Sequence, residues 1–115
     1  MHEYSVVSSL MDLCEMHAKK HNATKIERVV VSIGERAGMD KHLFVSAFET
    51  FKGELDICKE AVLEIVDEKV ELECLDCAKT CIPPNLEYGV CAHCGSQKVR
   101  IVKGTQMQLL SLEMV

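Results

Sequence analysis

The sequence predicts an α+β fold in which two helices pack on a small mixed sheet, with an inserted ribbon domain of short β-strands. Apolar residues recur at helical spacing in two segments, and β-branched residues alternate in others. Two Cys-x-x-Cys pairs lie close together in sequence rich in turn residues. We therefore expect residues 1–69 and 105–115 to form the α+β domain and residues 70–104 to form the ribbon.

The two predicted helices each carry one apolar stripe. The first is expected over residues 6–21, with Ser5 able to cap its start and Asn22 able to end it. The second follows Asp40 and ends at Gly53. The stripe of the first helix is Val6, Leu10, Leu13, Cys14 and His17, and that of the second is Phe44, Ala47, Phe48 and Phe51.

Extended segments account for most of the rest of the chain. Residues 26–33 alternate β-branched side chains, and residues 61–66 and 70–73 also read as strands. The polar break at residues 67–69 is a candidate hinge for exchange of a domain between two copies. Leu110, Leu112 and Met114 alternate in a final strand, which we expect to return and pair with the earlier strands.

The cysteine pairs predict a structural zinc site. Cys74 and Cys77 form the first pair, Cys91 and Cys94 the second, and thirteen residues separate the pairs. Two residues between cysteines let one tight turn direct both sulfurs at one ion, and two such turns complete a tetrahedron with no open position. Gly95 after the second pair is expected to relieve crowding in the turn. The alternative is unligated thiols or redox pairs, but a redox Cys-x-x-Cys is expected singly at the start of a helix.

Three cysteines and one histidine remain near these features. Cys14 lies on an apolar stripe and is expected to be a buried structural thiol. Cys81 either competes for zinc or is an ordinary strand residue, and Cys58 lies in a polar connection and has no predicted function. His93 lies between the second cysteines and is expected to point outward, although it could replace a thiolate or respond to pH.

The bulk composition limits the function classes. The net charge is −5 and aromatic residues make up 4%, so neither a basic surface nor a stacking platform for nucleic acid is expected. The charged residues of the ribbon cancel: Glu71, Glu73, Asp76 and Glu87 against Lys79, Lys98, Arg100 and Lys103. No apolar run is long enough to span a membrane, and no signal peptide is evident, so we expect a cytoplasmic protein.

The first residues can form a chelate. The α-amine of Met1 and the amide and imidazole of His2 place three nitrogens in one plane, a geometry that suits Ni(II) or Cu(II). A histidine at this position is usually just a surface residue. We find no nucleophile–base pair and no phosphate-binding loop, so the sequence does not predict an enzyme.

These residues together carry a family resemblance. The segments Met1-His2-Glu3, Ser5-Val6-Val7, residues 31–35, Phe48-Glu49 and the paired cysteines resemble the HypA family of nickel metallochaperones over essentially the whole chain. The resemblance implies a nickel-binding α+β domain with a zinc-ribbon domain, Zn²⁺ as structural metal and Ni²⁺ as cargo. It also implies nickel delivery for maturation of nickel–iron hydrogenase, and in some organisms for urease.

The resemblance further implies ligands and partners. Nickel would be held by His2, with Glu3 contributing its backbone or carboxylate, and Asp40 is a further candidate whose other role is to cap the second helix. The implied partners are a HypB-family GTPase, the precursor of the hydrogenase large subunit and urease accessory proteins. The chain could be a monomer or a dimer. The rival interpretation is a zinc-ribbon module that binds proteins or nucleic acid, which would be indifferent to His2.

Overall fold

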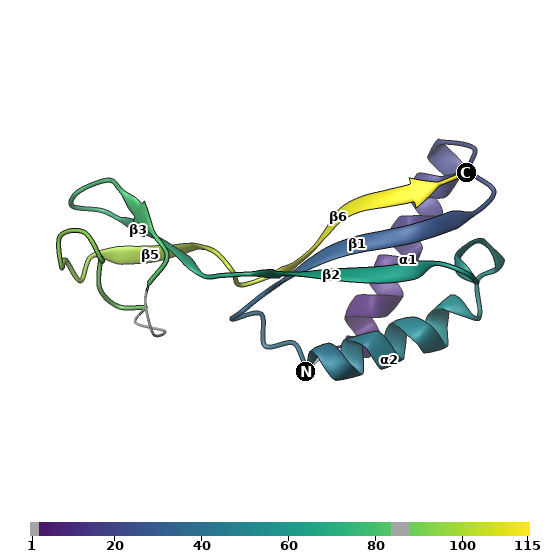
Figure 1. Cartoon of the computed structure of the whole chain (residues 1–115), viewed down its shortest axis with the longest axis horizontal. Coiled ribbons are helices and arrows are strands. Elements are labelled where there is room, and N and C mark those ends of the chain that lie inside the picture. Colours follow the sequence, from purple (N-terminus) through teal and green to yellow (C-terminus); the bar gives the residue numbers. More distant parts are fainter. Residues whose placement is uncertain (1–2, 84–87) are drawn as a thin grey trace. The chain divides into compact units, whose positions relative to one another are not determined.

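The computed structural model describes residues 3–83 and 88–115, which form two compact units (Figure 1). The first unit contains the described residues up to Ser32 together with Met39–Val66 and Gln108–Val115. The second contains Ile33–Gly38 and Asp67–Met107. Each unit is therefore assembled from segments that are distant in the sequence.

The first helix, α1 (Glu3–Lys20), begins before its predicted cap. Ser5 lies inside the helix, because the acidic Glu3 occupies the first turn, where the helix dipole favours a negative charge. The predicted end is confirmed. The backbone N–H of His21 still donates to the carbonyl of His17 at 3.1 Å, and Asn22 then adopts a left-handed conformation with φ of 55° that stops the helix.

The two helices bury one stripe each. In α1 the buried apolar residues are Val7, Leu10, Met11, Cys14 and Ala18. Leu10 and Cys14 were predicted, whereas Val6, Leu13 and His17 are only half-buried. The second helix, α2 (Lys41–Lys52), buries Phe44, Ala47 and Phe48 as expected. The edge of the Phe51 ring packs against Tyr4 of α1, with the ring centroids 6.1 Å apart.

A three-stranded sheet completes the first unit, and α1 lies behind it in Figure 1. Its strand order is β2 (Val62–Glu68), β1 (Ile26–Gly34), β6 (Met107–Met114). Hydrogen bonds from Val115 to Lys25 and from Gly34 to Gln106 make β6 antiparallel to β1. Contacts between Lys25 and Glu60 and between Glu35 and Glu68 show that β2 runs parallel to β1. The predicted mixed sheet is confirmed.

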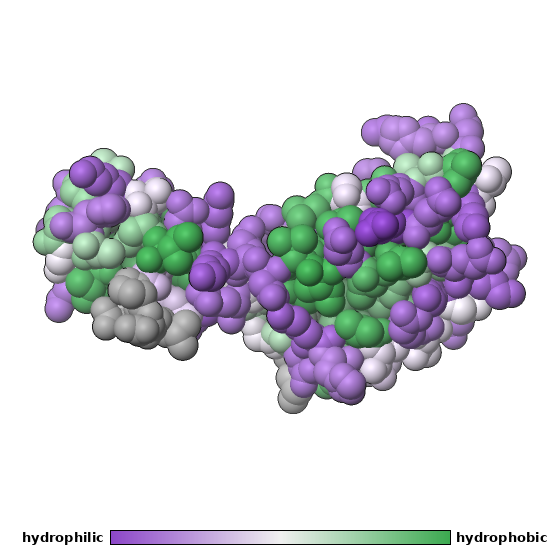
Figure 2. All heavy atoms as spheres, viewed as in Figure 1, coloured by the Kyte–Doolittle hydropathy of each residue, from purple (hydrophilic) through white to green (hydrophobic). Residues whose placement is uncertain are grey.

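Not every strand side chain is covered. Leu112 and Met114 are half-buried, but Leu110 is 51% exposed, so the predicted alternation of β6 shifts near this residue. Val62 and Val66 of β2 are also exposed. Figure 2 shows hydrophobic surface among polar residues on the visible face of this unit. No helix in the described part of the chain is long and apolar enough to cross a membrane.

The second unit contains the predicted ribbon. Its sheet has the order β4 (Thr80–Cys81), β3 (Glu71–Cys74), β5 (Val99–Lys103), and both pairings are antiparallel. The buried residues here include Val70, Leu72, Cys74 and Cys91. This core is small, so the unit needs a further source of stability.

Three segments of the second unit meet where the chain enters and leaves the ribbon. The backbone N–H of Arg36 donates to Gly104 O at 2.8 Å, and the N–H of Gly104 donates to the Glu68 carboxylate at 3.0 Å. A Cβ on Gly34 would lie 2.2 Å from the carbonyl carbon of Gly104, and one on Gly104 would lie 2.7 Å from Val70 Cα. The close approach of these backbones therefore requires glycine at both positions.

Candidate functional site

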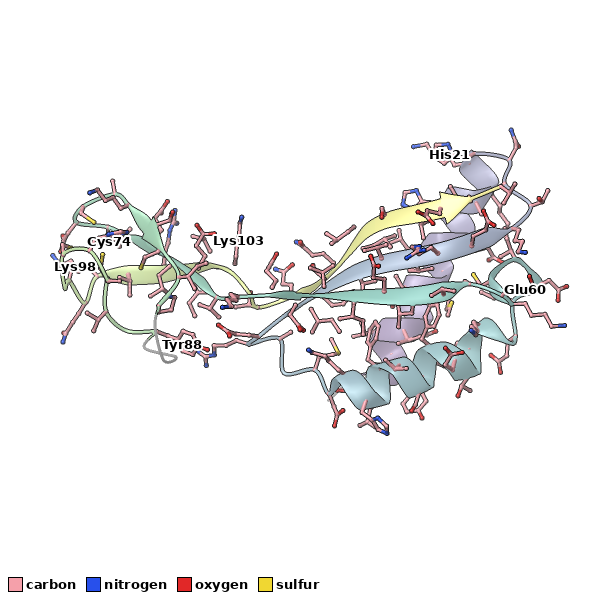
Figure 3. The ribbon with its side chains drawn as sticks, in the orientation of Figure 1. His21, Glu60, Cys74, Tyr88, Lys98 and Lys103 are labelled. Carbon is pink, nitrogen blue, oxygen red and sulfur yellow. The ribbon has the colours of Figure 1, made fainter. Side chains whose placement is uncertain are left out.

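The four paired cysteines form one cluster. The Sγ atoms of Cys74, Cys77, Cys91 and Cys94 all lie within 4.8 Å of one another. The distance from Cys74 to Cys94 is 3.6 Å, and from Cys77 to Cys91 it is 3.7 Å. A tetrahedral zinc ion with Zn–S bonds of about 2.3 Å needs sulfurs about 3.8 Å apart. The donor set and its spacing therefore fit a structural Zn²⁺ site, and Figure 3 places Cys74 beside the ribbon loops.

Each cysteine pair sits in the same kind of turn. The N–H of Cys77 points to the sulfur of Cys74 at 3.4 Å, and the N–H of His93 points to the sulfur of Cys91 at 3.4 Å. Ala78 and Gly95 follow the two pairs with φ of 60° and 75°. No atom lies within 4 Å of a Cβ built on Gly95. The crowding predicted there is absent, and glycine instead accommodates the left-handed backbone.

The turns also stabilise negative charge on sulfur. The pKa of Cys91 is lowered to about 6, chiefly by a backbone hydrogen bond from Cys94. A backbone hydrogen bond from Ser96 acts to lower the pKa of Cys94, but its contacts with the other cysteines and burial raise it to about 12. Four close sulfurs therefore cannot all be thiolates by themselves, whereas a bound dication would let all four ionise.

The other predicted residues of the ribbon lie outside the cluster. His93 is exposed, and its Nε2 lies 3.2 Å from the carbonyl oxygen of Thr80. A carbonyl only accepts, so Nε2 is the donor of this contact, and His93 is not a member of the sulfur cluster. Cys81 is a residue of β4, as the second of its two interpretations predicted. The ribbon cations Arg100 and Lys103 are paired with Glu73 and Glu71.

The remaining two cysteines are buried in the first unit. Cys14 and Cys58 are both fully buried, and Cys58 is the last residue of the short 3-10 helix Asp56–Cys58. Burial is the main cause that raises the pKa of the Cys14 thiol to about 12. None of the seven cysteines is in a disulfide. Both buried thiols are therefore inert core residues, and the prediction for Cys14 is confirmed.

The predicted nickel ligands divide into two groups. Met1 and His2 lie outside the described residues. Glu3 is only 4% exposed, and its Oε2 accepts a hydrogen bond of 2.9 Å from the backbone N–H of Asp40. Asp40 is the N-cap of α2, because its Oδ1 accepts from the N–H of Leu43 at 3.1 Å. The structure thus brings Glu3 and Asp40 together at the starts of the two helices.

Two residues with structural roles were not foreseen. The carboxylate of Glu35 accepts from the N–H of Val70 at 2.9 Å, and the Arg36 guanidinium lies 4.9 Å from the centre of the Tyr88 ring. Both contacts join the loop at residues 33–38 to the rest of the second unit. Their partners are distant in the sequence, and no local pattern marks them.

Known proteins resemble this chain over its full length. A family model described as hydrogenase/urease nickel incorporation, metallochaperone, hypA matches residues 1–114. The chain belongs to the HypA family. This is a family of metallochaperones and maturation factors rather than enzymes, in agreement with the prediction.

The individual family members cover almost the same length. The hydrogenase/urease maturation factor HypA of Helicobacter pylori is 66% identical, over 100% of this chain and 98% of its own. The hydrogenase maturation factor HypA of Helicobacter hepaticus is 49% identical, over 99% and 97%. The solution structure of the Ni metallochaperone HypA from Helicobacter pylori superposes with a TM-score of 0.79, at 66% identity and covering 100% and 98%. A second solution structure, of HypA protein, gives a TM-score of 0.81.

Proposed function

We propose that this chain is a nickel metallochaperone that captures Ni²⁺ at its N-terminal residues and passes it to the machinery that matures nickel–iron hydrogenase. Nickel is cargo, and Zn²⁺ at Cys74, Cys77, Cys91 and Cys94 is structural. We assign cargo binding to the α+β domain of residues 1–69 and 105–115. Membership of the HypA family and the functions of its similar members support this assignment.

The proposed nickel ligands are the α-amine of Met1 and the backbone and imidazole nitrogens of His2. The observation that carries the proposal is the bond between Glu3 and Asp40. It anchors Glu3, the residue that follows His2 in the sequence, to the start of α2, and this contact supports the choice of Asp40 as a further ligand. Because the Glu3 carboxylate already accepts from backbone N–H groups, we propose that Glu3 serves nickel through its backbone and that its side chain fixes the position. Asp40 then acts through its remaining carboxylate oxygen.

In this proposal the zinc site stabilises the ribbon and takes no part in the transfer of nickel. Four thiolates fill the coordination sphere, and the small core of the second unit cannot hold these loops alone. Metal binding and folding of the ribbon are therefore coupled.

The partners follow from the role. We propose that a HypB-family GTPase is the partner in nickel transfer and that it hydrolyses GTP, a reaction for which this sequence has no phosphate-binding loop. The precursor of the hydrogenase large subunit is the proposed destination. Urease accessory proteins form a second route, because a 66% identical relative carries the name hydrogenase/urease maturation factor. Seven cysteines without a disulfide suit the reducing cytoplasm where such partners act.

Calorimetric titration of Ni²⁺ into untagged, zinc-loaded protein tests the proposal. We expect one tight equivalent that disappears in His2→Ala while zinc content and fold are retained. A short peptide fused before Met1 should also weaken binding, because it converts the amine into an amide. His42→Ala, at an exposed histidine of α2, is the matched control and should bind as wild type does. Equal nickel affinity in wild type and His2→Ala would refute the site.

A further inference from the structure

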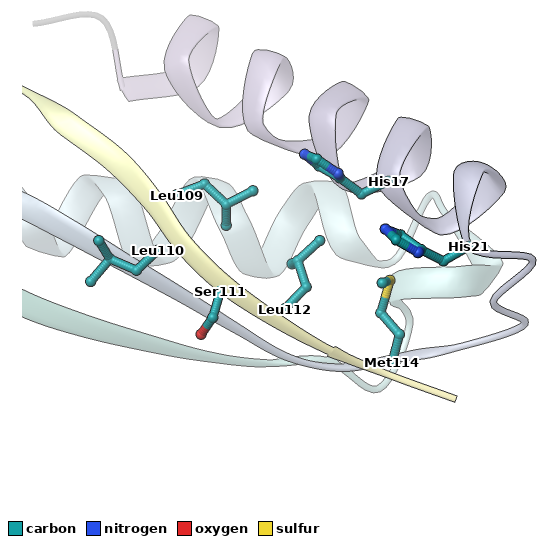
Figure 4. Close-up of a pocket in the computed structure, with 7 residues that line it drawn as sticks. All are labelled: His17, His21, Leu109, Leu110, Ser111, Leu112 and Met114. Atoms are coloured by element: carbon teal, nitrogen blue, oxygen red, sulfur yellow. The ribbon is translucent and has the colours of Figure 1, made fainter.

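A pocket between the end of α1 and strand β6 holds metal-binding side chains that the zinc cluster and the N-terminal site do not use. It has a volume of about 330 Å³. The lining residues are His17, His21, Leu109, Leu110, Ser111, Leu112 and Met114. All of them belong to the first unit, and Figure 4 shows both imidazoles on the side of α1 that faces β6.

The two histidines are held one helical turn apart. The N–H of His21 donates to the carbonyl of His17 at 3.1 Å, and the left-handed Asn22 directly after it fixes the end of the helix. Side chains four residues apart on a helix lie on one face, and histidine pairs at this spacing bind one metal ion in helical metal sites. The helical backbone therefore preorganises this pair.

The imidazoles are also free to bind. His17 is half-buried and His21 is exposed, and neither ring has a hydrogen bond or ion pair with another residue among those described. His17 lies on the last turn of α1 and His21 directly follows the helix, where the negative end of the helix dipole favours a cation. The thioether of Met114 lines the same pocket, and its sulfur points toward His21 in Figure 4.

The chemistry of the lining selects the class of ion. The described residues that line the pocket include no carboxylate, and Ser111 offers only a neutral hydroxyl, so the lining suits a hard ion such as Mg²⁺ or Ca²⁺ poorly. Imidazole nitrogen suits first-row ions such as Ni²⁺, Cu²⁺ and Zn²⁺, and a thioether adds a softer donor. We propose that His17 and His21, with Met114 as a third and weaker donor, form an auxiliary site for a borderline divalent transition-metal ion, with water in the remaining positions.

The test uses Ni²⁺ as the probe on the zinc-loaded full chain carrying His2→Ala. Long-range proton–nitrogen NMR follows the imidazole rings, and equilibrium dialysis measures affinity. We expect substoichiometric Ni²⁺ to broaden the His17 and His21 ring signals before those of His42. Removing either ring, in His17→Gln or His21→Gln, should weaken this binding by roughly tenfold to a hundredfold, because both rings belong to one chelate.

Matched variants separate a site from scattered surface binding. His42→Gln should leave the affinity unchanged. Met114→Leu should weaken it more than Met16→Leu, which changes an exposed methionine that directly precedes His17 but does not line the pocket. If His17→Gln and His21→Gln each lose no more affinity than His42→Gln, the rings bind independently and the site does not exist. If His2→Ala keeps its tight nickel equivalent, the proposed N-terminal nickel site is refuted. His17→Gln and His21→Gln, made in the wild-type chain, then still decide whether the auxiliary site exists.

Discussion

The carboxylate of Glu3 accepts a 2.9 Å hydrogen bond from the backbone N–H of Asp40, which is 37 positions away in the sequence. This bond joins the first turn of α1 to the N-cap of α2. It is also the direct link, among the described residues, between the two carboxylate-bearing candidates for the nickel site.

The bond should make the Asp40 amide sensitive to the charge of Glu3. The hydrogen bond from Asp40 is the main cause that lowers the pKa of Glu3 from its ordinary value of 4.5. A carboxyl whose pKa is lower in the folded state stabilises that state above pH 4.5, and this contribution is lost as the pH falls through the lowered pKa. We expect the Asp40 amide proton to titrate below pH 4.5 in NMR spectra. Measured in an Asp40→Asn background, which removes the aspartate's own carboxyl, the transition should remain, and it should vanish when Glu3→Gln is added. A midpoint at or above 4.5 would contradict the assignment.

Substitution of Gly34 by alanine should be strongly destabilising. The new Cβ would lie 2.2 Å from a backbone carbon of Gly104, and backbone cannot rotate away as a flexible side chain can. We expect a loss of about 1–3 kcal/mol or more in the free energy of unfolding, measured by urea denaturation of zinc-loaded protein. Gly53→Ala is the control. Gly53 has φ of −66° and its Cβ would meet only the Thr50 carbonyl at 3.7 Å, so the change should stay within about 1 kcal/mol.

The two cysteine turns should respond differently to reciprocal substitutions. Gly95→Ala places a side chain on a backbone with φ of 75°, at a cost of roughly 1–2 kcal/mol. Ala78→Gly removes the same strain at φ of 60°, which offsets the greater freedom of glycine in the unfolded chain. Zinc competition with a chelator should therefore show weaker affinity for Gly95→Ala and no comparable loss for Ala78→Gly. Equal losses in both would mean that the left-handed backbone is not what selects the residue.

Removal of zinc should unfold the second unit and spare the first. Treatment with a strong chelator, or Cys94→Ser, is expected to collapse the amide NMR signals of residues 71–103 while the signals of α1, α2 and the three-stranded sheet remain dispersed. Cys81→Ser is the control, because Cys81 lies outside the sulfur cluster, and it should keep one equivalent of zinc. Loss of zinc in Cys81→Ser would reopen the competition between this thiol and the four proposed ligands.

The sequence predicted the features that have a local cause. The spacing of the cysteine pairs specified the zinc cluster, and Phe44 and Phe48 specified the buried face of α2. The stripe of α1 was placed partly wrong, because Val6 and Val7 are equally apolar and only packing against the rest of the fold determines which of them is buried. Gly53 ends α2 as predicted, and it does so in an ordinary right-handed conformation.

Features that depend on pairing between distant segments could not be predicted in this way. Nothing near Glu3 indicates that its side chain reaches the N–H of Asp40. Likewise the loop Ile33–Gly38 belongs to the second unit through Glu35, Arg36 and the approach of Gly34 to Gly104. Glycine marks a special backbone in the sequence, but it does not reveal which other segment passes close to it.

The strand order of the first sheet has a consequence for folding. Strand β1 is central and pairs with both β2 and β6, and the whole ribbon lies between these two strands in the sequence. Closing so long a loop costs conformational entropy, and the ribbon lowers that cost when it brings Val70 and Gly104 together at its two ends. Because folding of the ribbon is coupled to zinc, a shortage of zinc would also slow completion of the domain that is proposed to carry the cargo.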